Sequence, residues 1–141
     1  MIERMPTGIE GFDKLIEGGI PKGSIVLIAG TPGTGKTIMC SEIACKNASD
    51  GKKVLYLNLE YDSDKLIRQM ALLGLNITGG GNLTVTGIDT TDSDSLDYVL
   101  ELIGTVDTRE IQNAVEEVRR KKTEGIIEKI STAGENDLIV L

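Results

Sequence analysis

A glycine-rich stretch at residues 30–37 constrains this chain more than any other part of its sequence. It matches the pattern GxxxxGK[ST] at every fixed position. The eight residues are, in order, Gly30, Thr31, Pro32, Gly33, Thr34, Gly35, Lys36 and Thr37. Glycine allows backbone conformations that are closed to other residues, so successive N–H groups can turn inward around a polyphosphate. The stretch therefore predicts a phosphate-binding loop, with a tight structural connection as the alternative.

The sequence on either side supports the phosphate-binding interpretation. The apolar run at residues 25–30 predicts a buried strand before the loop, and residues 37–49 predict an amphipathic helix after it. Thr37 and Ile38 open this helix, whose first amides lack internal partners and attract an anion. Lys36 is expected to bind the outer phosphates and assist catalysis, and the Thr37 hydroxyl to bind a metal. The expected ligands are ATP and Mg²⁺.

Length and composition predict one globular domain over residues 1–141. The chain is 40% apolar but only 3% aromatic, so its core must be built from Leu, Ile, Val and Ala. The absence of histidine excludes histidine-based acid–base chemistry. Cys40 and Cys45 are five residues apart on one predicted helix, and we expect them to stay reduced. A cytoplasmic protein is expected, because the sequence shows neither a signal pattern nor a long apolar run.

The net charge is −7, and the whole excess of acidic residues lies in residues 81–141. An acidic surface argues against nucleic-acid binding. The basic run at residues 119–122 follows two acidic residues on a predicted helix over 108–122, so a solvated helix end explains it better than a nucleic-acid patch.

A second predicted strand, residues 54–59, is followed at once by Glu60. In open parallel sheets, ligands bind at the carboxyl ends of the strands, so this carboxylate can face the same crevice as Lys36. A base near the terminal phosphate would orient and polarise the attacking water. Glu60 is therefore the candidate catalytic base, and the alternative is that it only caps the next helix or lies in solvent.

The remaining elements are expected to support this site. Helices are predicted at 62–73, 95–103 and 126–132, the last separated from 108–122 by Gly125, and strands at 83–88 and 137–141. Asp89 follows a strand, but that strand is half polar, which disfavours a metal role. The acidic residues Asp92, Asp94 and Asp97 lack the glycine and the distal glutamate of a calcium loop. They predict a solvated loop.

The opening segment carries a family resemblance. A short helix is predicted here, capped by Thr7. The segment resembles that of the RecA superfamily, and most closely that of KaiC-type ATPases and the related archaeal RadA and FlaH proteins. The positions that match TGxxxFDxLxxGGxPxG are Thr7, Gly8, Phe12, Asp13, Leu15, Gly18, Gly19, Pro21 and Gly23. The resemblance implies a three-layer α/β/α sandwich with a mainly parallel sheet, a catalytic glutamate at position 60, and ring-shaped or dimeric homo-oligomers.

The resemblance covers only the first part of the family's ATPase domain. The last strand resembles one that ends in a metal-associated aspartate, which this sequence does not reach. We therefore expect a fold that is incomplete at its C-terminus, from truncation or from a compact variant. The expected function is ATP binding and hydrolysis with a regulatory role. The alternatives are a nucleotide-binding switch with little hydrolysis and a RadA-type DNA-recombination ATPase.

Overall fold

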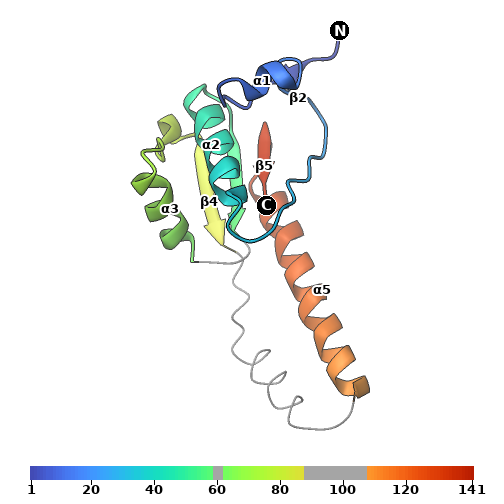
Figure 1. The fold of residues 1–141 in the computed structure, drawn as a ribbon. Helices are drawn as coiled ribbons and strands as arrows, with labels where there is room; N and C mark the ends of the chain where they lie inside the picture. Colours follow the sequence, from blue (N-terminus) through green and yellow to red (C-terminus); the bar gives the residue numbers. More distant parts are fainter. Residues whose placement is uncertain (59–61, 88–107) are drawn as a thin grey trace. The chain divides into compact units, whose positions relative to one another are not determined.

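The computed structural model describes residues 1–58, 62–87 and 108–141. The chain divides into two compact units, one formed by Met1–Thr86 with Glu135–Leu141 and the other by Gly87–Gly134. The first unit contains the phosphate loop, and Figure 1 shows its elements in order along the chain. The predicted helix 95–103 and the acidic residues Asp89, Asp92, Asp94 and Asp97 lie outside the described residues.

The first unit is built on a sheet in the strand order β4-β3-β5. Its strands span Leu83–Gly87 for β4, Val54–Asn58 for β3 and Leu138–Val140 for β5. β3 and β5 run parallel, with Val54 opposite Leu138 and Tyr56 opposite Val140. Every residue of β3 is buried, as expected for a strand inside a parallel sheet. The predicted α/β class with parallel pairing is thus confirmed.

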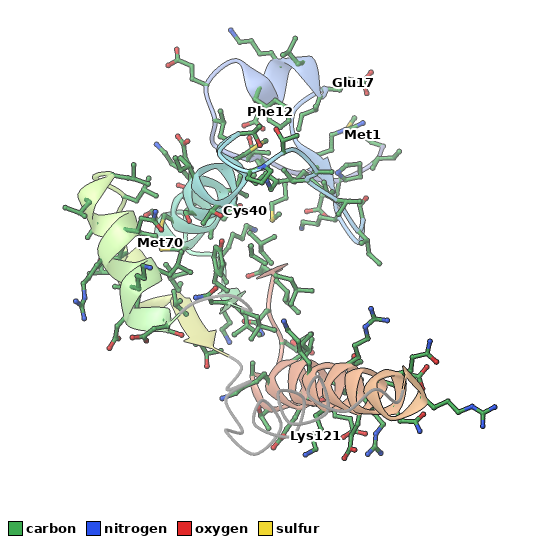
Figure 2. All side chains as sticks on the ribbon, turned by 60° about the horizontal axis from the view of Figure 1, so that its bottom comes forward. Met1, Phe12, Glu17, Cys40, Met70 and Lys121 are labelled. Atoms are coloured by element: carbon green, nitrogen blue, oxygen red, sulfur yellow. The ribbon has the colours of Figure 1, made fainter. Side chains whose placement is uncertain are left out.

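Two helices pack on one face of β3. They are α2 (Lys36–Ser49) and α3 (Ser63–Leu72). Their buried side chains form one cluster with the residues of β3 and β5 that face them: Ala44, Cys45, Ala48, Val54, Tyr56, Leu66, Met70 and Val140. Cys40 of α2 packs against this cluster, and Figure 2 labels it together with Met70 of α3. The core is mainly aliphatic, as the composition suggests, with Tyr56 as its one aromatic side chain among the residues of this cluster.

The segment before the phosphate loop differs from the prediction. Residues 25–30 were expected to form a buried strand, but they form no secondary structure and belong to an open loop between β2 (Ile20–Pro21) and α2 (Figure 1). Ile25 is 101% exposed and Leu27 is 87% exposed. A strand needs a neighbour to satisfy its backbone groups. None of the strands in the described part of the chain pairs with these residues, so hydrophobicity alone does not produce a strand here.

The opening segment folds around one carboxylate. The strand β1 (Arg4–Met5) pairs antiparallel with β2, and the short helix α1 (Phe12–Leu15) lies between them in sequence. Asp13 Oδ1 accepts bonds from the Thr7 amide at 2.8 Å and the Thr7 hydroxyl at 2.7 Å. Desolvation raises the pKa of Asp13, but these bonds and one from Gly8 outweigh it, so the pKa lies below its usual range. Thr7 is therefore not the predicted helix cap, because its hydroxyl is bonded to Asp13.

In the second unit, one long helix replaces the two helices that were predicted at 108–122 and 126–132. The helix α5 spans Thr108–Thr132 without a break at Gly125. A glycine inside a helix costs about 1 kcal/mol, which the backbone bonds of a long helix can absorb. An ion pair between Arg120 and Glu124, at 3.8 Å, spans the helical turn that directly precedes this glycine. Among the described residues, no helix is both long and apolar enough to cross a membrane.

A buried asparagine joins the opening segment to α2. Asn47 is 3% exposed, and its side-chain amide donates to the Pro6 carbonyl at 3.0 Å and to the Ile43 carbonyl at 2.9 Å. Next to it, a Cβ on Gly8 would lie 2.8 Å from the Lys46 Cβ, so the two segments are in close contact. Asn47 therefore fixes residues 6–8 against the second half of α2.

We expect Asn47→Leu to lower the free energy of unfolding by about 1–3 kcal/mol, because a side chain of similar shape leaves the Pro6 carbonyl without its donor. Urea unfolding followed by circular dichroism measures this as a lower midpoint with an unchanged slope. Asn113→Leu, at an exposed position of α5, is the matched control and should stay within about 0.5 kcal/mol of the parent. Equal midpoints for the two variants would contradict the role given to Asn47.

Candidate functional site

The phosphate loop enters α2 through two glycines in the left-handed region. Gly33 has φ of 81°, and Gly35, the residue before the helix, has φ of 90° and ψ of 15°. Side chains disfavour this region, so both positions require glycine. Apart from atoms of the glycine itself and of its neighbours along the chain, no heavy atom lies within 4 Å of the place where a Cβ would stand at either residue. The backbone is thus open here to a group that binds close to it.

The start of α2 offers free backbone donors at the same place. The first bond of the helix runs from the Met39 amide to the Gly35 carbonyl at 2.9 Å. The amides of Lys36, Thr37 and Ile38 precede it and have no carbonyl within the helix to bind. Thr37 and Ile38 are exposed, so a ligand can reach this helix end. The positive end of the helix dipole adds to the attraction for an anion.

Two side chains bind the carbonyls of the loop itself. The Lys36 ammonium donates to the Gly30 and Thr31 carbonyls, each at 2.9 Å. The Thr34 hydroxyl donates to the same Thr31 carbonyl at 2.8 Å. Lys36 therefore lies over the loop, where its charge is available to a polyphosphate. The predicted nucleotide-binding residues, 30–38, all lie in this loop and the first turn of α2.

The direction of α2 relative to β3 follows from two contacts, one near the end of α2 and one near its start. Near the end of α2, the Asn82 side chain donates to the Ala48 carbonyl at 3.3 Å, and the Asn82 carbonyl accepts from the Val54 amide at 2.9 Å. Nearer the start of α2, Ser41 hydrogen-bonds with Tyr56. The C-terminal part of α2 thus lies beside the beginning of β3, and the two elements run antiparallel.

This alignment brings the phosphate loop and the end of β3 to the same edge of the sheet. From Ser41 back to Thr37 the helix covers about 6 Å, and from Tyr56 on to Asn58 the strand covers about 6.6 Å. Thr37 and Asn58 therefore lie at a similar level. Glu60, the predicted catalytic base, lies outside the described residues, and so its side chain is not placed.

In the described part of the chain outside this loop, metal ligands and reactive thiols are not concentrated at any one place. Within residues 1–58, 62–87 and 108–141, no three acidic or cysteine side chains converge to hold a metal ion by themselves. Burial raises the pKa of the Cys40 and Cys45 thiols, which keeps both protonated near neutral pH. Burial also raises the pKa of Tyr56, more than its bond with Ser41 lowers it. These groups serve packing.

The loop, the helix start and the parallel sheet agree with the comparison to protein families. The sequence model of the KaiC ATPase family matches residues 5–137. The chain belongs to the KaiC ATPase family. Its opening segment, its phosphate loop and most of the residues that follow lie within the match.

Curated relatives of this KaiC-family chain match about half of it. A protein of the UPF0273 group from Thermotoga maritima is 40% identical over 77 residues, which is 55% of this chain and 32% of the relative. The DNA repair protein RadA of Aquifex aeolicus is 40% identical over 74 residues, 52% of this chain and 16% of RadA. The circadian clock oscillator protein KaiC of Prochlorococcus marinus is 34% identical over 77 residues, 54% of this chain and 15% of KaiC. The matches thus span about a third or less of each relative.

A solved structure supports the fold over nearly the whole chain. The crystal structure of a KaiC-like protein from the archaeon Pyrococcus horikoshii OT3 aligns with a TM-score of 0.60 and 23% sequence identity. The alignment covers 99% of this chain and 70% of that protein. This likeness concerns the fold, and it agrees with the RecA-like architecture expected for a KaiC-family chain.

Three contacts around the site were not predicted from the sequence. They are the Thr34 hydroxyl on the Thr31 carbonyl, the bond between Ser41 and Tyr56, and the attachment of Asn47 to Pro6. The sequence did contain a signal for the Asn47 contact. Asparagine is unfavourable inside a helix, and a side-chain hydrogen bond such as the one to Pro6 explains its presence there. Thr34 stands at a variable position of the motif, so the pattern alone says nothing of its side chain.

Proposed function

We propose that this KaiC-family chain binds Mg-ATP and contributes to its hydrolysis to ADP and phosphate. The observation that carries the proposal is the geometry of residues 30–38. Two left-handed glycines, an exposed helix start and the Lys36 ammonium occur together at one end of α2. An anion with several phosphates fits this set of donors, and the family to which the chain belongs is one of ATPases.

The helix-start amides, Lys36 and Thr37 each have a distinct part in the proposal. The amides at the start of α2 would bind the phosphates, and Lys36 would neutralise charge on the outer ones. The Thr37 hydroxyl, in the first turn of α2, would hold Mg²⁺ jointly with the nucleotide. That metal ion would supply charge stabilisation for the phosphates. A shared metal agrees with the described residues, which form no metal cluster of their own.

Glu60 completes the proposed site as the base that activates water. Support comes from the antiparallel alignment of α2 and β3, because Asn58, the last described residue of β3, lies level with Thr37. Glu60 follows two residues later in the sequence. A carboxylate near the terminal phosphate can accept a proton from the attacking water. Homo-oligomers, either rings or dimers, are also part of the proposal on the basis of the family.

Titration of the wild-type chain tests the proposal. Isothermal calorimetry with the slowly hydrolysed analogue ATPγS should show saturable binding in the presence of MgCl₂, and release of phosphate from ATP should follow the occupied fraction. Replacing MgCl₂ by EDTA should weaken binding, because Thr37 and the nucleotide would then lose their shared metal. The absence of saturation with ATPγS and MgCl₂ at millimolar concentrations would overturn the proposal.

Two other functions are kept as alternatives, the first of them for one observation. Similarity to RadA favours a DNA-linked ATPase, although the acidic net charge of −7 opposes it. A titration with single-stranded DNA at several salt concentrations would show a steep salt dependence for that function. A nucleotide-binding switch, the second function, would bind Mg-ATP as well as the proposed hydrolase but would release almost no phosphate.

A further inference from the structure

The side chain of Thr34 makes contacts that the motif does not specify. Its hydroxyl donates to the Thr31 carbonyl at 2.8 Å and so closes a turn over residues 31–34. It also lies against Gly30, since a Cβ built on Gly30 would stand 2.7 Å from the Thr34 hydroxyl oxygen. One side chain thus connects both ends of the curled part of the loop.

The Thr31 carbonyl needs such a partner for a chemical reason. Residue 32 is proline, so the peptide between residues 31 and 32 carries an acceptor but no N–H donor. This peptide can offer nothing to a phosphate. If the Thr31 carbonyl oxygen pointed toward a bound anion, it would repel that anion. A hydrogen bond that holds this carbonyl within the loop prevents the oxygen from pointing that way.

Lys36 also donates to the Thr31 carbonyl, at 2.9 Å, but its ammonium is the group that would contact a phosphate. The bond from Thr34 does not depend on where that ammonium lies. Thr34 is therefore the partner that can keep the carbonyl fixed while Lys36 reaches toward a ligand.

We propose that Thr34 is a positioning residue for nucleotide binding, whose hydroxyl holds residues 30–33 in the curled conformation that receives phosphates. This inference rests on the proposed function, and it adds a role for a side chain where the motif requires only a backbone. Removing the hydroxyl should weaken the binding of phosphates and leave the chemistry of bound ATP unaltered.

The experiment compares Thr34→Val, which keeps the shape but removes the donor, with Thr34→Ser, which keeps the donor. For Thr34→Val we expect the Kd for ATPγS with MgCl₂ to rise about three- to tenfold, the range for loss of one neutral hydrogen bond. KM for ATP should rise with it, while kcat stays within about twofold. Thr34→Ser should bind within about twofold of the wild type.

Thr84→Val, at an exposed position of β4, controls for the substitution itself and should bind as the wild type does. Equal Kd values for Thr34→Val and the wild type would overturn the inference and leave the proposed function intact. So would an equal loss of affinity in Thr34→Ser and Thr34→Val, because the hydroxyl would then not be the cause.

A measurement without nucleotide keeps the inference testable by itself. The carbonyl ¹³C resonance of Thr31 should shift in Thr34→Val and remain close to the wild-type position in Thr34→Ser, since it reports the bond directly. An unshifted resonance in Thr34→Val would overturn the inference. If this resonance behaves as expected but the wild type binds no ATPγS, the proposed function fails and Thr34 has no nucleotide to position.

Discussion

If Glu60 is the proposed base, we expect Glu60→Gln to lower the rate of ATP hydrolysis by about a hundredfold to ten-thousandfold, the range associated with a positioned general base. The amide has the size of the carboxylate but cannot accept the proton of the attacking water. ATP affinity should stay within about twofold, because in the proposed site the phosphates bind to the loop and to Lys36 and not to Glu60. Phosphate release under saturating ATP measures the first effect, and ATPγS titration measures the second.

Glu10→Gln, at an exposed position before α1, is the matched control and should hydrolyse ATP at the wild-type rate. A Glu60→Gln variant that is as fast as the wild type would show that Glu60 is not the base. If the wild type and the variant both bind ATP and both release almost no phosphate, the switch function replaces the hydrolase.

We expect Lys36→Ala to raise the Kd for ATPγS about tenfold to a hundredfold, since a hydrogen bond from a charged donor contributes about 1.5–3 kcal/mol. Hydrolysis at a fixed, limiting ATP concentration falls at least as far. The loop itself should keep its conformation, because the Gly30 and Thr31 carbonyls that Lys36 binds are exposed and water can replace the ammonium. Calorimetry on the folded variant measures the change.

The control is Lys14→Ala, which removes an exposed lysine from α1 and should leave the Kd unaltered. The pair separates a specific phosphate contact from a general loss of positive charge. If both variants lose affinity equally, the effect is one of net charge. Unchanged binding in Lys36→Ala would mean that the lysine does not contact the phosphates.

The sequence predicted the helix starts and the strand near the candidate site well, because local chemistry decides these elements. The motif at 30–37 placed the start of α2 within one residue, at Lys36, and Asp62 was correctly expected at the start of α3, where its side chain accepts from the Asp64 amide at 3.1 Å. The predicted strand 54–59 agrees with β3 over the described residues Val54–Asn58. A helix start and a buried strand depend on a few neighbouring side chains, which a single sequence contains.

The errors arose where distant parts of the chain decide the structure. The run at residues 25–30 has the composition of a buried strand, but a strand also requires a paired neighbour. Gly125 has a weak helix propensity, but it lies inside a helix of 25 residues. Thr7 has the side chain of a helix cap, but it bonds to Asp13, six residues away. Pairing partners and alternative acceptors of this kind do not appear in local patterns.

The attachment of Asn47 to Pro6 has a consequence for the chain between β2 and α2. Residues 6–8 are fixed on one half of α2, and β1, which precedes them, pairs with β2. The segment that carries the phosphate loop begins after β2 and ends in α2, so both of its ends are held at the same helix. A tethered segment samples fewer conformations than a free one. The opening residues would therefore reduce the conformational entropy that the loop loses if it orders around a bound nucleotide.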